Sequence, residues 1–193
     1  MTTGTVERTL ELLAESGALL KGHFKLSSGR HSNEYCQCAR VLAHPDAAEE
    51  LGRMLAGLFL DDDVDLVVSP ALGGIVIGHE VARALGVRAL FAEREGGKMT
   101  LRRGFAVRES ERVLIVEDVR TTGGSVLEVA EVVRAAGGVV AGFGFILDRS
   151  QEERDLGAPA RALARRRMES HEPEQCPLCG SGVPIQKPGS RQG

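Results

Sequence analysis

Apolar positions along the chain alternate between helical and strand-like spacing. Residues 5–20 carry them at helical spacing with Gly17 as the expected stop, and Pro45 is suited to begin a helix that reaches about Leu60. Two strand–helix–strand units follow, over residues 64–69, 74–85 and 87–92 and over residues 113–117, 124–136 and 139–147. This alternation predicts an α/β fold with a mostly parallel sheet and right-handed crossovers.

The remaining stretches predict smaller elements. Residues 23–42 indicate a hairpin of short strands around a Ser-Ser-Gly-Arg turn. Residues 93–112 are glycine-rich and charged, which favours a surface loop or flexible hairpin of the kind that acts as a lid. After residue 148 we expect one edge strand near 161–168 and a poorly ordered terminus.

Composition is that of one globular domain with an appendage: 193 residues, 42% hydrophobic and 26% charged. The net charge of −3 gives no support for a nucleic-acid partner. No apolar run approaches the ~20 residues that span a bilayer, and the first residues lack a secretory signal pattern. We therefore expect no membrane partner and a cytoplasmic location. Four cysteines in two close pairs do not indicate a disulfide framework.

The stretch from Val113 to Val126 carries the clearest chemistry. Four apolar residues without polar alternation predict a strand covered on both faces, with Glu117 and Asp118 at its carboxyl end. A small polar loop then precedes the next helix: Thr121, Thr122, Gly123, Gly124 and Ser125. Helix amino termini attract phosphate, whereas carboxylates repel phosphate and accept hydrogen bonds from sugar hydroxyls. The stretch predicts a sugar phosphate ligand, with ordinary helix capping as the alternative.

Two further segments predict a second phosphate group on the same ligand. The loop after the strand at 64–69 leaves the same sheet edge and offers the backbone donors of Ala71, Leu72, Gly73 and Gly74. A Pro-Gly turn required by geometry is the alternative there. Residues 93–104 carry four cations on a glycine-hinged stretch: Arg94, Lys98, Arg102 and Arg103. Such a stretch could close over a polyphosphate leaving group, and a solvated charged loop is its alternative.

The acidic pair and the loop that follows it resemble the phosphoribosyl pyrophosphate signature of type I phosphoribosyltransferases. The resemblance implies an α/β fold with a mostly parallel sheet flanked by helices and a small N-terminal hood. It also implies that Glu117 and Asp118 hold the ribose hydroxyls, that residues 121–125 bind the 5′-phosphate, and that residues 71–74 contact pyrophosphate. On this basis the chain divides into a helix and hood (1–42), a phosphoribosyltransferase core (43–168) and a tail (169–193).

Three segments resemble the orotate branch of that family: residues 24–32, residues 93–105, and Leu147-Asp148-Arg149. The resemblance implies orotate contacts from Ser27, Ser28, Gly29, Tyr35, Thr121 and Arg149. Chemistry agrees for Arg149, because a guanidinium can bind the orotate carboxylate with two hydrogen bonds. The alternative for Arg149 is an ordinary surface ion pair with Asp148. The alternative for Tyr35 is a core residue without a ligand contact.

The implied reaction transfers the phosphoribosyl group of phosphoribosyl pyrophosphate to N1 of orotate, in the de novo synthesis of pyrimidines. Catalysis then rests on Glu117, Asp118 and a lid cation, which is Lys98, Arg102 or Arg103, since this lid lacks the histidine of many orotate enzymes. Mg²⁺ is expected to enter with the substrate, and the family implies a homodimer whose lid reaches the neighbour's site. A purine or uracil phosphoribosyltransferase is one alternative, and a non-catalytic sensor of phosphoribosyl pyrophosphate is another.

The cysteines raise a separate question. Cys176 and Cys179 have the spacing of half a zinc site, for which His171, Cys36 and Cys38 are possible further ligands. Cys36 and Cys38 lie two apart on a predicted strand and favour core thiols. The other histidines show no ligand spacing among themselves: His23, His31, His44 and His79.

Overall fold

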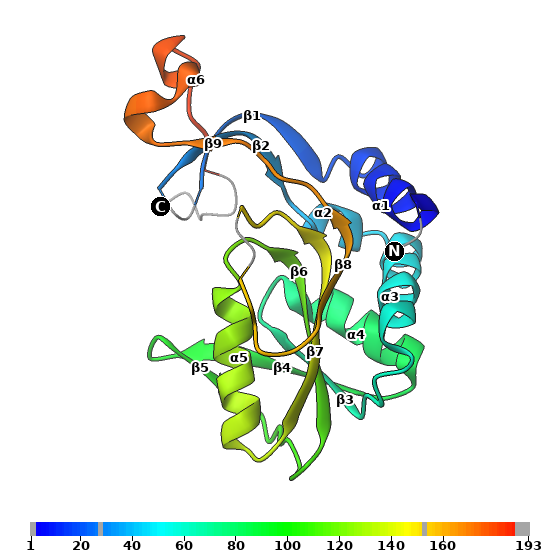
Figure 1. Ribbon diagram of the computed structural model, residues 1–193. Coiled ribbons are helices and arrows are strands. Elements are labelled where there is room, and N and C mark those ends of the chain that lie inside the picture. Colours follow the sequence, from blue (N-terminus) through cyan, green and yellow to red (C-terminus); the bar gives the residue numbers. More distant parts are fainter. Residues whose placement is uncertain (1–2, 27–28, 152–153, 188–193) are drawn as a thin grey trace.

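The computed structural model describes residues 3–26, 29–151 and 154–187. It contains a six-stranded sheet in the order β5-β4-β3-β6-β7-β8 and a three-stranded sheet in the order β1-β2-β9. Figure 1 shows the smaller sheet lying beyond one end of the larger one, together with the last part of the chain. We call this smaller sheet, with the segment that follows it, the hood.

The larger sheet confirms the predicted α/β fold. Its strands are β3 (Leu66–Pro70), β4 (Arg88–Glu95), β5 (Lys98–Leu101), β6 (Arg112–Arg120), β7 (Val139–Asp148) and β8 (Ala160–Arg165). All neighbouring pairs are parallel except β4 and β5, which form an antiparallel hairpin at one edge. The charged lid segment is therefore a hairpin, and the expected edge strand near 161–168 is β8.

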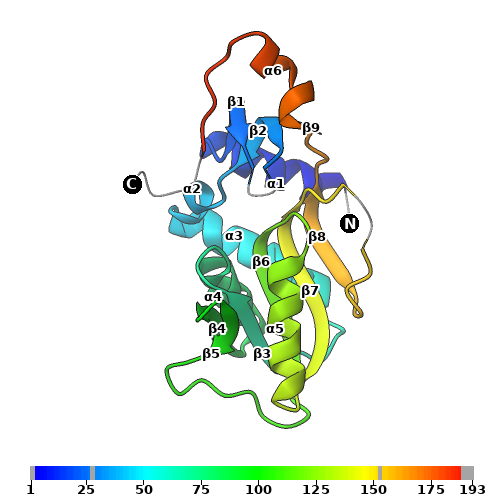
Figure 2. The ribbon, with the colours of Figure 1, turned by 90° about the vertical axis from the view of Figure 1, so that its left-hand side faces the viewer.

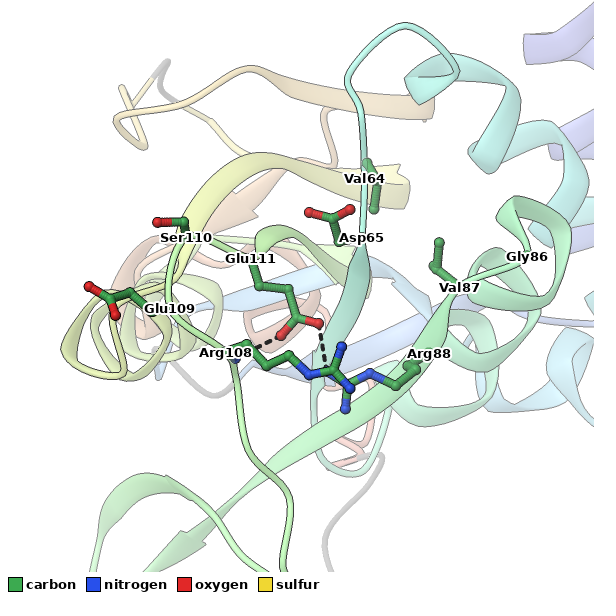
Figure 3. Close-up of a pocket in the computed structure, with 9 residues that line it drawn as sticks. All are labelled: Val64, Asp65, Gly86, Val87, Arg88, Arg108, Glu109, Ser110 and Glu111. Atoms are coloured by element: carbon green, nitrogen blue, oxygen red, sulfur yellow. Dashed lines mark hydrogen bonds and ion pairs between the residues drawn. The ribbon is translucent and has the colours of Figure 1, made fainter.

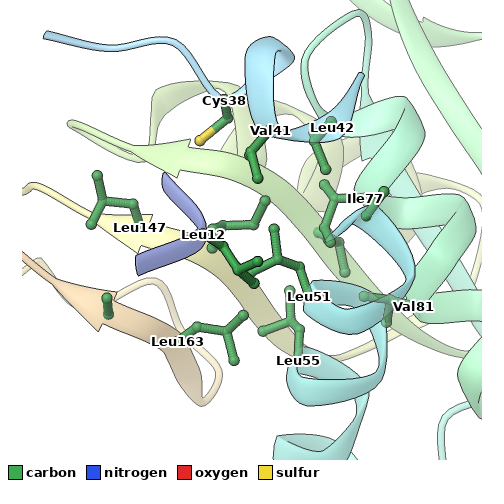
Figure 4. Packing of buried hydrophobic residues seen from close by; sticks show 14 of the residues in the cluster. Leu12, Cys38, Val41, Leu42, Leu51, Leu55, Ile77, Val81, Leu147 and Leu163 are labelled. Atoms are coloured by element: carbon green, nitrogen blue, oxygen red, sulfur yellow. The ribbon is translucent and has the colours of Figure 1, made fainter. Parts of the chain in front are cut away.

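Helices cover both faces of this sheet, as alternating strand residues require. Val67 packs with α1 (Thr3–Glu15), α3 (Pro45–Ala56) and α4 (Gly74–Leu85) in one apolar cluster, part of which is drawn in Figure 4. Its neighbours Leu66 and Val68 belong to a second cluster with α5 (Gly124–Ala135). Figure 2 shows α5 and the pair α3 and α4 on opposite sides of the strands. A strand buried on both faces explains the unbroken apolar runs in the sequence.

Most predicted boundaries agree with the structure, and the differences have local causes. The helix expected up to Leu60 ends at Ala56 and continues as one 3-10 turn, η1 (Gly57–Phe59). The first helix ends at Glu15, where Gly17, with a φ of +63°, turns the chain into a strand. Strand β6 extends three residues past the expected end at Glu117, because β7 pairs with it as far as Arg120.

The hood joins an early segment of the chain to a late one. Strands β1 (Leu19–Lys25) and β2 (His31–Cys36) form the expected hairpin, and the short helix α2 (Ala39–Leu42) leads into the core. The terminus is more structured than expected, since β9 (Ser170–His171) pairs with β2 and is followed by η2 (Pro173–Gln175) and α6 (Pro177–Gly180). Within the described residues, no helix is long and apolar enough to cross a membrane.

Candidate active site

The acidic pair and the second loop meet where β3 and β6 lie side by side. These strands are parallel and in register from Leu66 opposite Val113, so the residues after them leave the same sheet edge. A Cβ placed on Gly73 would lie 2.9 Å from Oδ1 of Asp118, which shows how closely the loop backbone approaches the carboxylate. A Cβ placed on Gly74 would likewise lie 2.9 Å from the carbonyl oxygen of Val116 in β6. Glycine is required at position 74, where the nearest atom belongs to the backbone, whereas at position 73 a Cβ would displace the carboxylate of Asp118.

The two carboxyl groups are half-buried and hard to ionise. Burial, together with the charge of Asp118, raises the pKa of Glu117 from 4.5 to about 8, and a hydrogen bond with Ser125 opposes this only in part. Burial also raises the pKa of Asp118, although its Oδ1 accepts a hydrogen bond of 2.8 Å from the backbone N–H of Val119. Among the described residues, neither carboxylate forms an ion pair. Groups arranged in this way are typical of a ligand site.

The predicted phosphate loop begins directly after β6 and ends at the start of α5. Gly123 has a φ of +77° and precedes the first helical residue, Gly124. Thr122 accepts a hydrogen bond of 3.3 Å at Oγ1 from the N–H of Gly124, so this hydroxyl does serve the turn. The side chains of Thr121 and Thr122 are exposed, and Ser125 lies beside Glu117. The structure thus brings the loop and the acidic pair together.

Arg149 lies just beyond β7 and differs from a surface arginine. It is 7% exposed, and its guanidinium carbon lies 6.0 Å from the centre of the Tyr35 ring. Burial lowers its pKa, and no carboxylate in the described part of the chain pairs with it. The alternative interpretation, a surface ion pair between Asp148 and Arg149, is wrong because Asp148 instead contacts Arg120 at 3.6 Å. Among the described residues, the buried guanidinium of Arg149 therefore has no carboxylate partner.

Tyr35 connects the hood to the acidic pair. It is half-buried, its ring centre lies 5.8 Å from that of Phe24, and burial raises the pKa of its hydroxyl. The charges of Arg149 and Asp118 act on the same hydroxyl in opposite directions, which places the three groups near one another. Gly29 has a φ of +87° in the turn of the hairpin, whereas Ser27 and Ser28 lie outside the described residues.

The lid cations have carboxylate partners in this conformation, with one exception. Arg94 contacts Glu128 of α5 at 2.7 Å. Arg102 and Arg103 contact Glu93 at 3.8 and 3.1 Å. Lys98 forms no ion pair with any described residue. Figures 1 and 2 both show the hairpin of β4 and β5 apart from the hood.

A family model described as a phosphoribosyl transferase domain matches residues 37–170. The chain belongs to the phosphoribosyltransferase family. A protein named orotate phosphoribosyltransferase from Pelotomaculum thermopropionicum is 56% identical over 188 residues, which are 97% of this chain and 99% of that protein. One of the same name from Desulforamulus reducens is 52% identical, over 96% of this chain and 97% of that protein.

Solved structures agree with the type I phosphoribosyltransferase fold. An orotate phosphoribosyltransferase from Aeropyrum pernix matches with a TM-score of 0.69 and 28% identity, covering 80% of this chain and 92% of that one. An adenine phosphoribosyltransferase from Thermoanaerobacter pseudethanolicus matches with a TM-score of 0.60 and 25% identity, covering 69% of this chain and 88% of that one.

A pocket on this phosphoribosyltransferase lies at the opposite sheet edge, where strands begin. Figure 3 shows its lining, which includes Arg88 at the start of β4 and Glu111 just before β6. Glu111 accepts hydrogen bonds of 2.6 Å from Arg88 and 2.8 Å from the N–H of Arg108. These charged groups already satisfy one another, and ligands of open α/β sheets bind at the carboxyl ends. The pocket is therefore not the candidate site.

Sequence reasoning missed one cluster. His23 and His31, for which no ligand spacing was found, lie with Cys176 and Cys179, and their four ligand atoms are all within 4.8 Å of one another. The sequence contains no local signal for the histidine pair of this cluster, because the two histidines come together through the register of the β1–β2 hairpin. The interpretation of Cys36 and Cys38 as core thiols is confirmed, since both are buried and their sulfur atoms lie 3.5 Å apart, although Cys38 follows the strand.

Proposed function

We propose that this chain is an orotate phosphoribosyltransferase, which joins orotate to the phosphoribosyl group of phosphoribosyl pyrophosphate and releases pyrophosphate. The environment of Arg149 is the observation that favours orotate over other bases. Its guanidinium is buried without a carboxylate partner among the described residues, beside Tyr35 and near Asp118. The orotate carboxylate supplies the missing charge, whereas a purine or uracil has no carboxylate and leaves the cation unpaired. Relatives that are 50–56% identical carry this name.

Different residues at the sheet edge bind different parts of the second substrate, phosphoribosyl pyrophosphate. Glu117 and Asp118 accept hydrogen bonds from the ribose hydroxyls, because ionised carboxylates are acceptors only. The exposed threonines and backbone N–H groups of residues 121–125 bind the 5′-phosphate at the start of α5, and Thr121 also donates to the pyrimidine. The backbone of residues 71–74 contacts pyrophosphate. The close approach of Gly73 to Asp118 supports this division, since it places the two binding regions side by side.

The reaction needs orientation and electrostatic stabilisation rather than a nucleophile from the protein. The bond between the anomeric carbon and pyrophosphate breaks, a bond to N1 of orotate forms, and N1 loses its proton to solvent. Positive charge develops at the anomeric carbon, which the ionised carboxylates of Glu117 and Asp118 favour. Arg149 and Tyr35 hold the base opposite that carbon, which raises the effective concentration of N1.

Mg²⁺ fits the same edge of the sheet. Glu117 and Asp118 are hard oxygen donors without a cation partner among the described residues, and Mg²⁺ binds through few carboxylates and through substrate phosphates. When bound, Mg²⁺ neutralises charge on the leaving pyrophosphate. Lys98 and one of the lid arginines, Arg102 or Arg103, supply further positive charge once they exchange their carboxylate partners for phosphate. The expected cytoplasmic location stays a prediction.

We further propose that the enzyme acts as a homodimer in which each lid serves the site of the other chain. The position of the β4–β5 hairpin away from the hood supports this arrangement. Mixing Lys98→Ala chains with Asp118→Asn chains tests it, because a mixed dimer then contains one site with both groups intact. Recovery of up to about a quarter of wild-type activity is expected from random pairing. If the mixture is no more active than its two components, the lid acts within its own chain.

The function is tested by the ultraviolet absorbance of orotate mixed with the protein, Mg²⁺ and phosphoribosyl pyrophosphate. We expect orotate to be consumed at a rate proportional to enzyme concentration, and adenine, guanine, hypoxanthine and uracil to be left unchanged. The double variant Glu117→Gln, Asp118→Asn should lose at least about a thousandfold in turnover. An unchanged orotate spectrum, or a near-normal rate in the double variant, would contradict the proposal.

A further inference from the structure

Four side chains from three separate segments converge in the hood. They are His23 of β1, His31 of β2, and Cys176 and Cys179, which flank the start of α6. Nε2 of His23 lies 3.1 Å from Nδ1 of His31, 3.5 Å from the sulfur of Cys176 and 3.7 Å from that of Cys179. Nδ1 of His31 lies 3.2 Å from the sulfur of Cys179.

These separations are those of ligands around one tetrahedral ion. With Zn–N bonds of about 2.0 Å and Zn–S bonds of about 2.3 Å, two nitrogens lie about 3.3 Å apart and a nitrogen and a sulfur about 3.5 Å apart. The observed values of 3.1 Å for the nitrogen pair and 3.2–3.7 Å for the mixed pairs agree within a few tenths of an ångström. These are four of the six separations, and all four ligand atoms lie within 4.8 Å of one another.

The surroundings of His23 also suit a metal ligand. Its Nδ1 donates a hydrogen bond of 2.7 Å to the carbonyl oxygen of Val183, which leaves the lone pair of Nε2 directed toward the cluster. A backbone carbonyl that holds the second nitrogen is the usual support for a metal-bound histidine. Two thiolates and two neutral imidazoles would balance the double charge of zinc, and their softness favours zinc over Mg²⁺.

The segment that contains the cysteines needs a support other than an apolar core. Between residues 172 and 187, all of them described, Cys176 is the one buried side chain. The segment is otherwise fastened at its ends, by β9 and by backbone hydrogen bonds of 2.8 and 2.7 Å that join Gln186 to Lys25 and His23. Short segments without a core of their own commonly depend on a structural metal.

We propose that His23, His31, Cys176 and Cys179 bind one structural Zn²⁺ that fastens the end of the chain to the hood. On binding, the two thiols release their protons to solvent and the sulfur atoms bind as thiolates. All four positions are filled by the protein, so the ion has no open position for a substrate and takes no part in catalysis. The proposal does not depend on the choice of base or on the reaction itself.

The test measures metal content in the full-length protein, purified with added Zn²⁺ and without chelators. We expect one zinc per chain by elemental analysis, retained through dialysis, and less than a tenth of an equivalent in Cys179→Ser. His44→Ala is the matched control, because His44 is exposed and lies outside the cluster, and it should keep the full equivalent. Zinc below a tenth of an equivalent in the wild type, or full zinc in Cys179→Ser, would overturn the proposal.

Two further measurements keep the proposal testable if Cys179→Ser fails to fold. Replacing zinc by Co²⁺ in the wild type should give the intense visible bands of a tetrahedral site with thiolate ligands, and the weak bands of octahedral Co²⁺ would contradict it. Mass spectrometry of protein kept under air distinguishes the metal site from a Cys176–Cys179 disulfide. A mass lower by two hydrogens at this pair, in zinc-supplemented protein, would show the disulfide and exclude the site.

Discussion

Replacing Glu117 by Gln should make the protein more stable while reducing its activity. The carboxyl group of Glu117 has a pKa of about 8 in the folded protein, against 4.5 ordinarily, so the folded state holds this proton more tightly than the unfolded chain does. By linkage, folding stability falls as pH rises from about 4.5 to 8. At pH 7 the expected penalty is about 3 kcal/mol at most, and solvent screening of a half-buried group reduces it to about 1–3 kcal/mol.

Glutamine keeps the shape and a hydrogen-bonding group but carries no charge, so Glu117→Gln should recover that free energy. Urea denaturation at pH 5, 7 and 8.5 measures it. The gain over wild type should be near zero at pH 5, about 1–3 kcal/mol at pH 7 and larger at pH 8.5. Glu131→Gln, an exposed change on α5, is the control and should alter the free energy of unfolding by less than about 0.5 kcal/mol at each pH. A gain that is absent, or equal at all three pH values, would refute the reasoning.

The same titration should appear in the kinetics. Because the ionised form of Glu117 accepts the ribose hydroxyls, kcat/KM for phosphoribosyl pyrophosphate should rise with pH until the pKa near 8 is passed. The pH profile of a variant that retains the charge, Glu117→Asp, should keep a rise of this kind even if its rate is lower. If kcat/KM for phosphoribosyl pyrophosphate does not change between pH 6 and 9, groups other than Glu117 bind the ribose.

Three further changes test separate parts of the structure. Arg149→Lys should raise the KM for orotate about 10- to 100-fold and leave that for phosphoribosyl pyrophosphate nearly unchanged, because lysine cannot bind the carboxylate with two parallel hydrogen bonds. Gly73→Ala should lower kcat at least about tenfold with a small change in Tm, since its Cβ would lie 2.9 Å from a carboxylate oxygen of Asp118. Glu111→Gln should destabilise the protein by about 1–3 kcal/mol above pH 5, as measured by denaturation, because it weakens the contact with Arg88.

Each of these changes has a control in the same chain. Equal increases in both KM values for Arg149→Lys would indicate general damage rather than loss of a carboxylate contact. Gly57→Ala introduces a methyl group with no atom within 4 Å and should leave kcat unchanged. Burial raises the pKa of Glu111, but hydrogen bonds from Arg108 and Arg88 lower it by more, so the net shift is downward. The contribution of Glu111 to stability should therefore disappear as pH falls below about 4.5. An undiminished contribution at pH 3 would contradict this.

Local signals in the sequence predict the elements that they bound directly. The helix Gly74–Leu85 has its expected limits because Gly73 precedes it and Gly86, with a φ of +72°, ends it. The extension of β6 through Arg120 could not be predicted, because polar residues continue a strand only where a neighbouring strand pairs with them. The resemblance implied that Arg149 reaches orotate. Its burial, and the pairing of Asp148 with Arg120 instead of Arg149, depend on tertiary contacts that local patterns do not indicate.

The cluster in the hood shows the same limit for long-range contacts. His23 and Cys176 lie 153 positions apart, and no local periodicity relates them. The CxxC spacing indicates half a site, and the other half becomes visible only when the hairpin register and the path of the tail are both known.

The pairing of an early with a late segment in the hood also bears on how the chain folds during its synthesis. The first two strands of the hood precede the six-stranded core in the sequence, whereas the third strand, Cys176 and Cys179 follow it. The six-stranded core can therefore assemble while the hood is still an incomplete hairpin, since domains fold as the chain emerges. Contacts between such distant residues form late and slowly. The nascent chain would thus acquire its core first and complete the hood only after the residues that follow the core have been synthesised.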